Sequence, residues 1–169
     1  MKKICLILFF LFFSFVLLKA QNTITDSIYH QFSYHHFIVH TPPQYHQSKS
    51  LPLLIVLHGE DQRAEDMERY SEFNVVSDSG GFIVVYPEMQ WKKDKRKSEL
   101  TTFPDITSSD INYCAGLLDS LQTKYNIDEE KIYVAGFSKG GLLAQILLLQ
   151  LHNKIAASAS VASLVCPGL

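Results

Sequence analysis

This chain of 169 residues has no surplus of positive charge. Its 15 basic side chains are outnumbered by 17 acidic ones, and three of the basic residues fall within the first twenty positions. Beyond position 20 the balance is 12 basic to 17 acidic side chains, a formal charge of −5. Such a balance lacks the basic footprint of a nucleic-acid-binding protein, so we expect no nucleic-acid partner.

The chain also lacks an apolar run long enough to cross a membrane. Its longest run, residues 4–18, has fifteen residues and a single serine, whereas a spanning helix needs about twenty. Two lysines precede this run, and Ala20 follows it closely, which is the order of a secretory signal peptide. We therefore expect a signal peptide over 1–20, cut after Ala20. The remaining domain, 21–169, would belong to a secreted or periplasmic protein with no stable membrane anchor.

Cysteines are few. One of the three, Cys5, falls in the leader. Cys114 and Cys166 could pair in an oxidising compartment. However, Cys114 also falls on the apolar face of an expected helix, where a buried free thiol is typical. The sequence leaves both interpretations open.

No zinc-type spacing of ligands is present, although five histidines lie close together at positions 30, 35, 36, 40 and 46. On a strand, His35 and His36 point to opposite faces, and His36 and His40 lie about 13 Å apart. That geometry is poor for shared ligation. We therefore expect solvated strand histidines, with no metal and no cofactor.

The apolar pattern predicts strands alternating with helices along most of the chain. Continuous apolar runs such as 52–57 and 82–86 are typical of strands buried on both faces of a parallel sheet. Residues 22–30 are polar and carry no prediction. Expected strands are 32–40 (near a sheet edge), 52–57, 82–86, 132–135 and 155–161, and expected helices are 64–77, 110–126 and 142–151. This order predicts a doubly wound, mostly parallel α/β sheet.

The most informative stretch is Gly136-Phe137-Ser138-Lys139-Gly140, with an apolar strand before it and an apolar helix after it. In that context G-x-S-x-G is typical of a nucleophile elbow. The serine takes strained backbone angles, and the two glycines let strand and helix approach closely. A glycine-rich turn without a catalytic role is the alternative.

Taken together, four segments resemble the α/β-hydrolase fold, and within it the polyhydroxybutyrate depolymerase and feruloyl esterase group. The resemblance runs from about Ser33 to Ser163. Its segments are Pro42-Pro43, Leu53-Leu-Ile-Val-Leu-His58-Gly59, Gly81-Phe-Ile-Val-Val-Tyr-Pro87-Glu88, and Tyr125-Asn-Ile-Asp128 leading to the Gly136–Gly141 elbow.

This resemblance implies hydrolysis of a carboxylic ester, such as a small ester or an ester of a plant polysaccharide. Ser138 would be the nucleophile, and the backbone N–H groups of Lys139 and Glu60 would form the oxyanion hole. His58 and Gly59 would support that loop. A carboxylate at position 60 is unfavourable beside a developing oxyanion unless it turns to solvent.

The acid and the histidine of a serine triad are not found after the elbow. The 31 residues beyond Ser138 contain His152 and no aspartate or glutamate. Along a helix His152 would lie about 20 Å from Ser138, and helix 142–151 and strand 155–161 would lack their usual cover. We therefore expect a C-terminally truncated hydrolase that is weak or inactive as 169 residues.

Two alternatives remain open at this stage. The chain could be a secreted, non-catalytic module that binds polysaccharide through Trp91 and the basic residues 92–97. It could also be an acyl-thioesterase or phospholipase-type carboxylesterase, since these enzymes share a similar elbow. The sequence does not name the ester.

Overall fold

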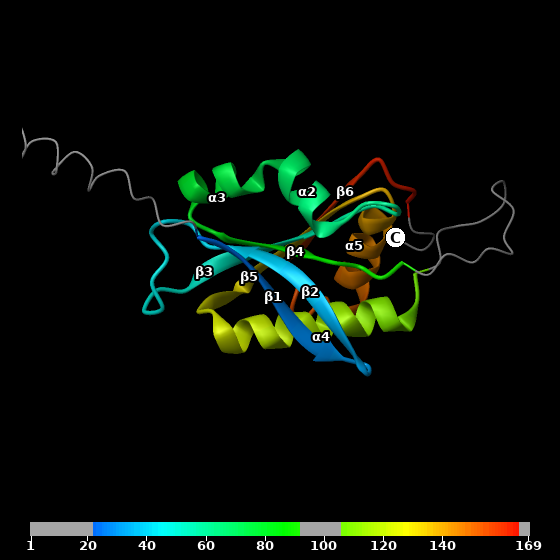
Figure 1. The fold of residues 1–169 in the computed structure, drawn as a ribbon, viewed down its shortest axis with the longest axis horizontal. Helices are drawn as coiled ribbons and strands as arrows, with labels where there is room; N and C mark the ends of the chain where they lie inside the picture. Colours follow the sequence, from blue (N-terminus) through cyan, green and yellow to red (C-terminus); the bar gives the residue numbers. More distant parts are fainter. Residues whose placement is uncertain (1–21, 92–105, 166–169) are drawn as a thin grey trace, which may run out of the picture.

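A computed structural model describes residues 22–91 and 106–165 of the chain. Within these ranges the protein forms one six-stranded sheet with the order β1-β2-β4-β3-β5-β6 (Figure 1). The strands are β1 Thr23–His30, β2 Ser33–His40, β3 Leu51–Leu57, β4 Ile83–Pro87, β5 Ile127–Phe137 and β6 Ala157–Val161. The helices are α2 Ala64–Ser71, α3 Phe73–Gly80, α4 Ser108–Lys124 and α5 Lys139–Gln150.

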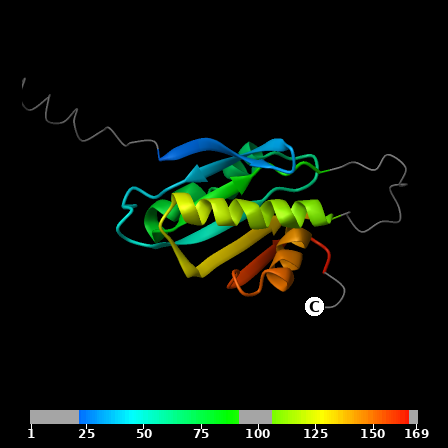
Figure 2. The same ribbon diagram turned by 90° about the horizontal axis from the view of Figure 1, so that it is seen from below.

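The sheet is mostly parallel and carries helices on both faces. Strands β4, β3, β5 and β6 run parallel, while β2 joins β4 antiparallel and β1 pairs antiparallel with β2. Helices α2 and α3 lie on one face, and α4 and α5 lie on the other (Figures 1 and 2). The predicted doubly wound, mostly parallel α/β fold is thus confirmed.

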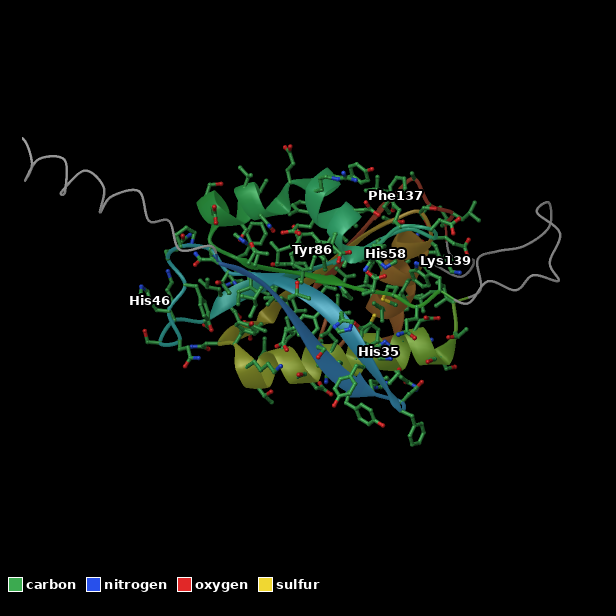
Figure 3. The ribbon with its side chains drawn as sticks, viewed as in Figure 1. His35, His46, His58, Tyr86, Phe137 and Lys139 are labelled. Atoms are coloured by element: carbon green, nitrogen blue, oxygen red, sulfur yellow. The ribbon has the colours of Figure 1, made fainter. Side chains whose placement is uncertain are left out.

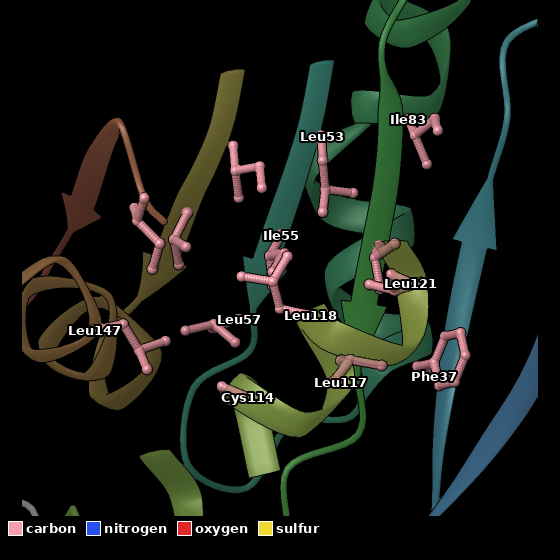
Figure 4. Close-up of a cluster of buried hydrophobic side chains, with 14 of the residues drawn as sticks. Phe37, Leu53, Ile55, Leu57, Ile83, Cys114, Leu117, Leu118, Leu121 and Leu147 are labelled. Atoms are coloured by element: carbon pink, nitrogen blue, oxygen red, sulfur yellow. The ribbon is translucent and has the colours of Figure 1, made fainter. Parts of the chain in front are cut away.

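Alternate side chains of the central strands feed two separate cores. Leu53, Ile55 and Leu57 of β3 pack with α4 and α5 in the larger core (Figure 4). Val56 faces the other way and packs with Ala64 and Met67 of α2. Burial on both faces explains why this strand reads as a continuous apolar run. The carboxyl end of β3 is thereby fixed between the two helical layers.

One strand was not predicted, and one helix prediction was wrong. The edge strand β1, Thr23–His30, falls in a stretch that carried no prediction. The single helix expected over 64–77 is two helices, because Glu72 takes a left-handed conformation (φ +53°) that ends α2 and begins α3. After this bend Phe73 packs against the smaller core, so both helices stay on the same face of the sheet.

The sequence had suggested that the strand histidines are solvated, and this prediction was wrong for two of them. His35 and His40 are buried. The His40 ring bonds Thr23 Oγ1 at 2.7 Å and pairs with Asp78 at 2.9 Å, and the His35 ring stacks on Tyr113. Burial therefore follows from their place under α3 and α4. No group of three metal-ligating side chains gathers within the described ranges.

Cys114 is a free thiol buried against β3, and burial raises its pKa well above the ordinary value. None of the helices in the described ranges is long and apolar enough to cross a membrane. The expected signal peptide, the basic residues 92–97 and Cys166 lie outside the residues that the structure describes.

Candidate active site

Ser138 occupies the single residue between β5 and α5. Its backbone has φ +53° and ψ −118°, a region that costs a non-glycine residue about 1–3 kcal/mol. The Ser138 N–H donates to Val161 O of β6 at 2.8 Å, and its carbonyl accepts from Leu142 N at 3.1 Å. The surrounding strand and helix therefore hold the serine in a strained turn, with its side chain partly exposed.

Two glycines make this turn sterically possible. A Cβ atom at Gly136 would lie 2.2 Å from Gly140 O. A Cβ atom at Gly140 would lie 2.5 Å from the carbonyl oxygens of both Leu57 and His58. Strand β5, helix α5 and the end of β3 therefore meet backbone against backbone, as close approach through glycine allows. The loop that follows β3 is thereby brought beside Ser138.

His58 begins that loop and is fully buried. Its Nε2 accepts a hydrogen bond from the Met89 N–H at 2.9 Å, so a neutral ring carries its proton on Nδ1. Nδ1–H then donates to Gly59 O at 2.7 Å. Burial lowers the pKa of His58, in keeping with a neutral ring. Both nitrogens are engaged in holding backbone, and neither is directed to Ser138.

The side chains of Lys139 and Glu60 meet across the site. Lys139 Nζ donates to Glu60 Oε1 at 3.0 Å, and it lies 4.9 Å from the centre of the Trp91 ring. Only 3% of the Lys139 side chain is exposed, against 44% for Glu60. Figure 3 shows His58 and Lys139 at the same end of the sheet. Sequence reasoning did not predict this ion pair, because its partners are 79 positions apart.

His152 lies past the far end of α5 and is exposed. The twelve residues of α5 span about 18 Å, and the His152 ring contacts Leu149 O. Among residues 22–91 and 106–165 no histidine bonds the Ser138 hydroxyl. The described part of the chain thus brings together Ser138 and the loop after β3, without a base.

A small cavity of about 50 Å³ lies elsewhere, between β2 and the start of α4. Among the residues lining it are His35, Gln90 and Tyr113. None of the residues that the sequence assigned to the site lines this cavity.

Comparisons with known proteins indicate the family to which the chain is similar. The family model described as "Esterase PHB depolymerase" matches residues 34–168. The chain is 33% identical over 108 residues to the bifunctional acetylxylan esterase/xylanase XynS20E of Neocallimastix patriciarum, covering 64% of this chain and 15% of that protein. It is 33% identical over 114 residues to the putative esterase NocK of Nocardia uniformis subsp. tsuyamanensis, covering 66% and 32%. The chain thus spans less than a third of either relative.

Among solved structures, the ferulic acid esterase AmCE1/Fae1A of Anaeromyces mucronatus superposes with a TM-score of 0.64. That match covers 85% of this chain and 59% of the other, at 17% identity. At such low identity the likeness concerns the fold alone. It supports the α/β-hydrolase architecture described above.

Proposed function

The chain belongs to the esterase PHB depolymerase family, and from that premise we propose that it carries the nucleophile and oxyanion hole of a serine carboxylic-ester hydrolase. The observation that carries the proposal is the strained backbone of Ser138 (φ +53°) at the junction of β5 and α5. Backbone strain of this kind persists where the surrounding structure enforces it, and it concentrates at active sites.

The proposed reaction starts with attack of Ser138 Oγ on the ester carbonyl carbon as a base removes the hydroxyl proton. The carbonyl oxygen becomes an oxyanion that accepts hydrogen bonds from the N–H groups of Lys139 and Glu60. Lys139 is the first residue of α5, where an N–H has no acceptor within the helix. Among the described residues the Glu60 N–H donates no hydrogen bond. Collapse of the intermediate releases the alcohol and leaves an acyl-enzyme, which water hydrolyses.

The base in this scheme is none of the described histidines. His58 uses both nitrogens on backbone groups, and His152 lies at the other end of α5. The proposal therefore takes domain 21–169 as the amino-terminal portion of a hydrolase, with the triad histidine and acid supplied by other sequence. We expect hydrolysis of esters by the 169-residue chain to be weak or absent, while slow labelling of Ser138 by a reactive probe should remain measurable.

For the substrate, we propose an acyl group esterified to a polymer. One relative is named an acetylxylan esterase, and the family is named after depolymerases of the polyester polyhydroxybutyrate. Acetyl or feruloyl esters of plant polysaccharide and hydroxyalkanoate esters therefore form the set to test first.

The alternative of a non-catalytic polysaccharide-binding module finds less support. Trp91 is partly buried, and its indole N–H donates to Gly59 O at 3.0 Å. Its ring also lies beside the Lys139 ammonium. A tryptophan used in this way is not a free platform for sugar rings. Pull-down on xylan with a Trp91→Ala control tests this alternative directly.

A fluorophosphonate probe, which reacts with activated serine hydroxyls, tests the proposed function. Labelling of the full chain that maps to Ser138 by mass spectrometry, and that Ser138→Ala abolishes, would support it. Nitrophenyl acetate provides a second readout, as a burst of nitrophenol of at most one equivalent. Labelling of other serines at the rate of Ser138 would contradict the proposal.

We also propose that the protein is exported through its leader, residues 1–20. Expression in a secreting host followed by amino-terminal sequencing tests this, with Gln21 expected as the first residue. Recovery of an uncut chain in the cytoplasm would contradict it.

A further inference from the structure

We propose that the Lys139 side chain is a positioning residue that clamps the two halves of the oxyanion hole together. It joins the first residue of α5 to Glu60 in the loop after β3. This inference rests on the proposed function, because that function assigns oxyanion contacts to the N–H groups of these same two residues. The clamp itself consists of the side chains of Lys139, Glu60 and Trp91.

The position of Lys139 is costly without such a partner. Its side chain is only 3% exposed, and a buried ammonium needs a compensating charge. It also stands at the amino terminus of α5, where the helix dipole disfavours a cation. The Glu60 carboxylate at 3.0 Å and the Trp91 ring at 4.9 Å supply the compensation. We therefore assign to the Lys139 side chain the role of contacting Glu60 and Trp91.

The pairing also removes a difficulty that Glu60 creates. A free carboxylate beside the oxyanion would repel the developing negative charge. Bonded to Lys139, the carboxylate is neutralised by the adjacent ammonium. The ion pair thus lets an acidic residue stand in the oxyanion loop.

Trp91 completes the clamp by orienting one peptide group. Gly59 O accepts hydrogen bonds from His58 Nδ1 at 2.7 Å and from Trp91 Nε1 at 3.0 Å. The peptide group is planar and trans, so fixing the Gly59 carbonyl also fixes the direction of the Glu60 N–H. The same tryptophan ring lies against the Lys139 ammonium. The clamp thereby sets both the direction of one donor and the distance between the two.

Three variants test the clamp: Lys139→Met, Glu60→Gln and the double variant. Lys131→Met is the matched control, since Lys131 pairs with Asp128 at 2.7 Å on the exposed beginning of β5. Trp91 is the only tryptophan in the chain, so its emission maximum and acrylamide quenching report on the clamp without reference to activity. The second-order rate of Ser138 labelling by the fluorophosphonate reports on the oxyanion hole.

Each single variant is expected to shift Trp91 emission, to increase its quenching, and to slow Ser138 labelling about tenfold to a hundredfold, since small displacements of catalytic groups have effects of that size. The double variant should be about as slow as either single one, because all three lose the same contact. Lys131→Met should match the wild type in both readouts.

Effects that multiply in the double variant, or a double variant that returns to the wild-type rate, would overturn the clamp. The first outcome would mean independent roles for the two side chains. The second would mean that charge compensation alone mattered. If the wild-type chain is not labelled at all, the proposed function fails while fluorescence still decides on the contact. Trp91 quenching that neither single variant changes would then overturn the clamp.

Discussion

Substitution of Gly136 by alanine should disrupt the turn that holds Ser138. The added Cβ would lie 2.2 Å from Gly140 O and 2.3 Å from Gly140 C, whereas ordinary contacts begin at 3.4 Å. Both atoms belong to the backbone of α5, so no side-chain rotation can relieve the clash. The start of the helix must move by about 1 Å. Overpacking of this kind costs typically 1–3 kcal/mol, and the rigidity of both partners favours the upper end of that range.

The assay is urea denaturation of purified protein, followed by Trp91 fluorescence and far-ultraviolet circular dichroism. We expect Gly136→Ala to lower the free energy of unfolding by about 3 kcal/mol. Gly116→Ala is the control, because its nearest contact is a side-chain atom, His30 Nδ1, at 3.2 Å, and alanine gains up to about 1 kcal/mol of helix propensity. A Gly136→Ala midpoint equal to that of the wild type would refute the close packing of β5 on α5.

Two further variants and one titration follow from the same structure. Ser138→Gly should be more stable than Ser138→Ala by about 1 kcal/mol, because glycine relieves part of the strain at φ +53°; equal denaturation midpoints would contradict the strained turn. Glu72→Gly should be neutral or stabilising by up to about 1 kcal/mol, since Glu72 also has φ +53°; a clear loss of stability would contradict this. Burial lowers the pKa of His58 below its ordinary 6.5, so the unfolded chain binds protons first. The contribution of His58 to the free energy of unfolding should therefore be complete above about pH 6.5 and decline as the pH falls towards the folded-state pKa. A His58→Gln variant whose free energy of unfolding depends on pH as steeply as that of the wild type would contradict that assignment.

The parts of the fold that the sequence predicted are those in which burial dictates composition. Strands β3 and β4 are apolar throughout because both of their faces are covered. The helix over Ser108–Lys124 has its apolar side chains at helical spacing, and Cys114, which was expected on its apolar face, is buried together with Leu118 and Leu121. For these elements the local pattern and the tertiary environment agree, and the prediction required no knowledge of distant contacts.

The errors arose where the backbone takes a conformation that its residues do not signal. The turn between β1 and β2 places Gln31 and Phe32 at φ +45° and +67°, positions usually filled by asparagine or glycine. No hairpin signal therefore precedes β2, and β1 was missed. Likewise, a glutamate at position 72 does not indicate a left-handed residue that separates two helices. The alternation of residues along β2 does not show which of its faces a helix covers, so the burial of His35 and His40 could not be predicted.

The candidate site likewise has one part that the sequence could predict and one part that it could not. The spacing of Gly136, Ser138 and Gly140 is local, so the sequence could predict a strained turn between a strand and a helix. The pairing of Lys139 with Glu60 depends on where the loop after β3 is placed, and only the fold supplies that. From the sequence alone Glu60 looked like a defect in an oxyanion loop. In the structure the Glu60 carboxylate and the buried Lys139 ammonium each compensate the charge of the other. The effect of substituting either residue therefore depends on the other.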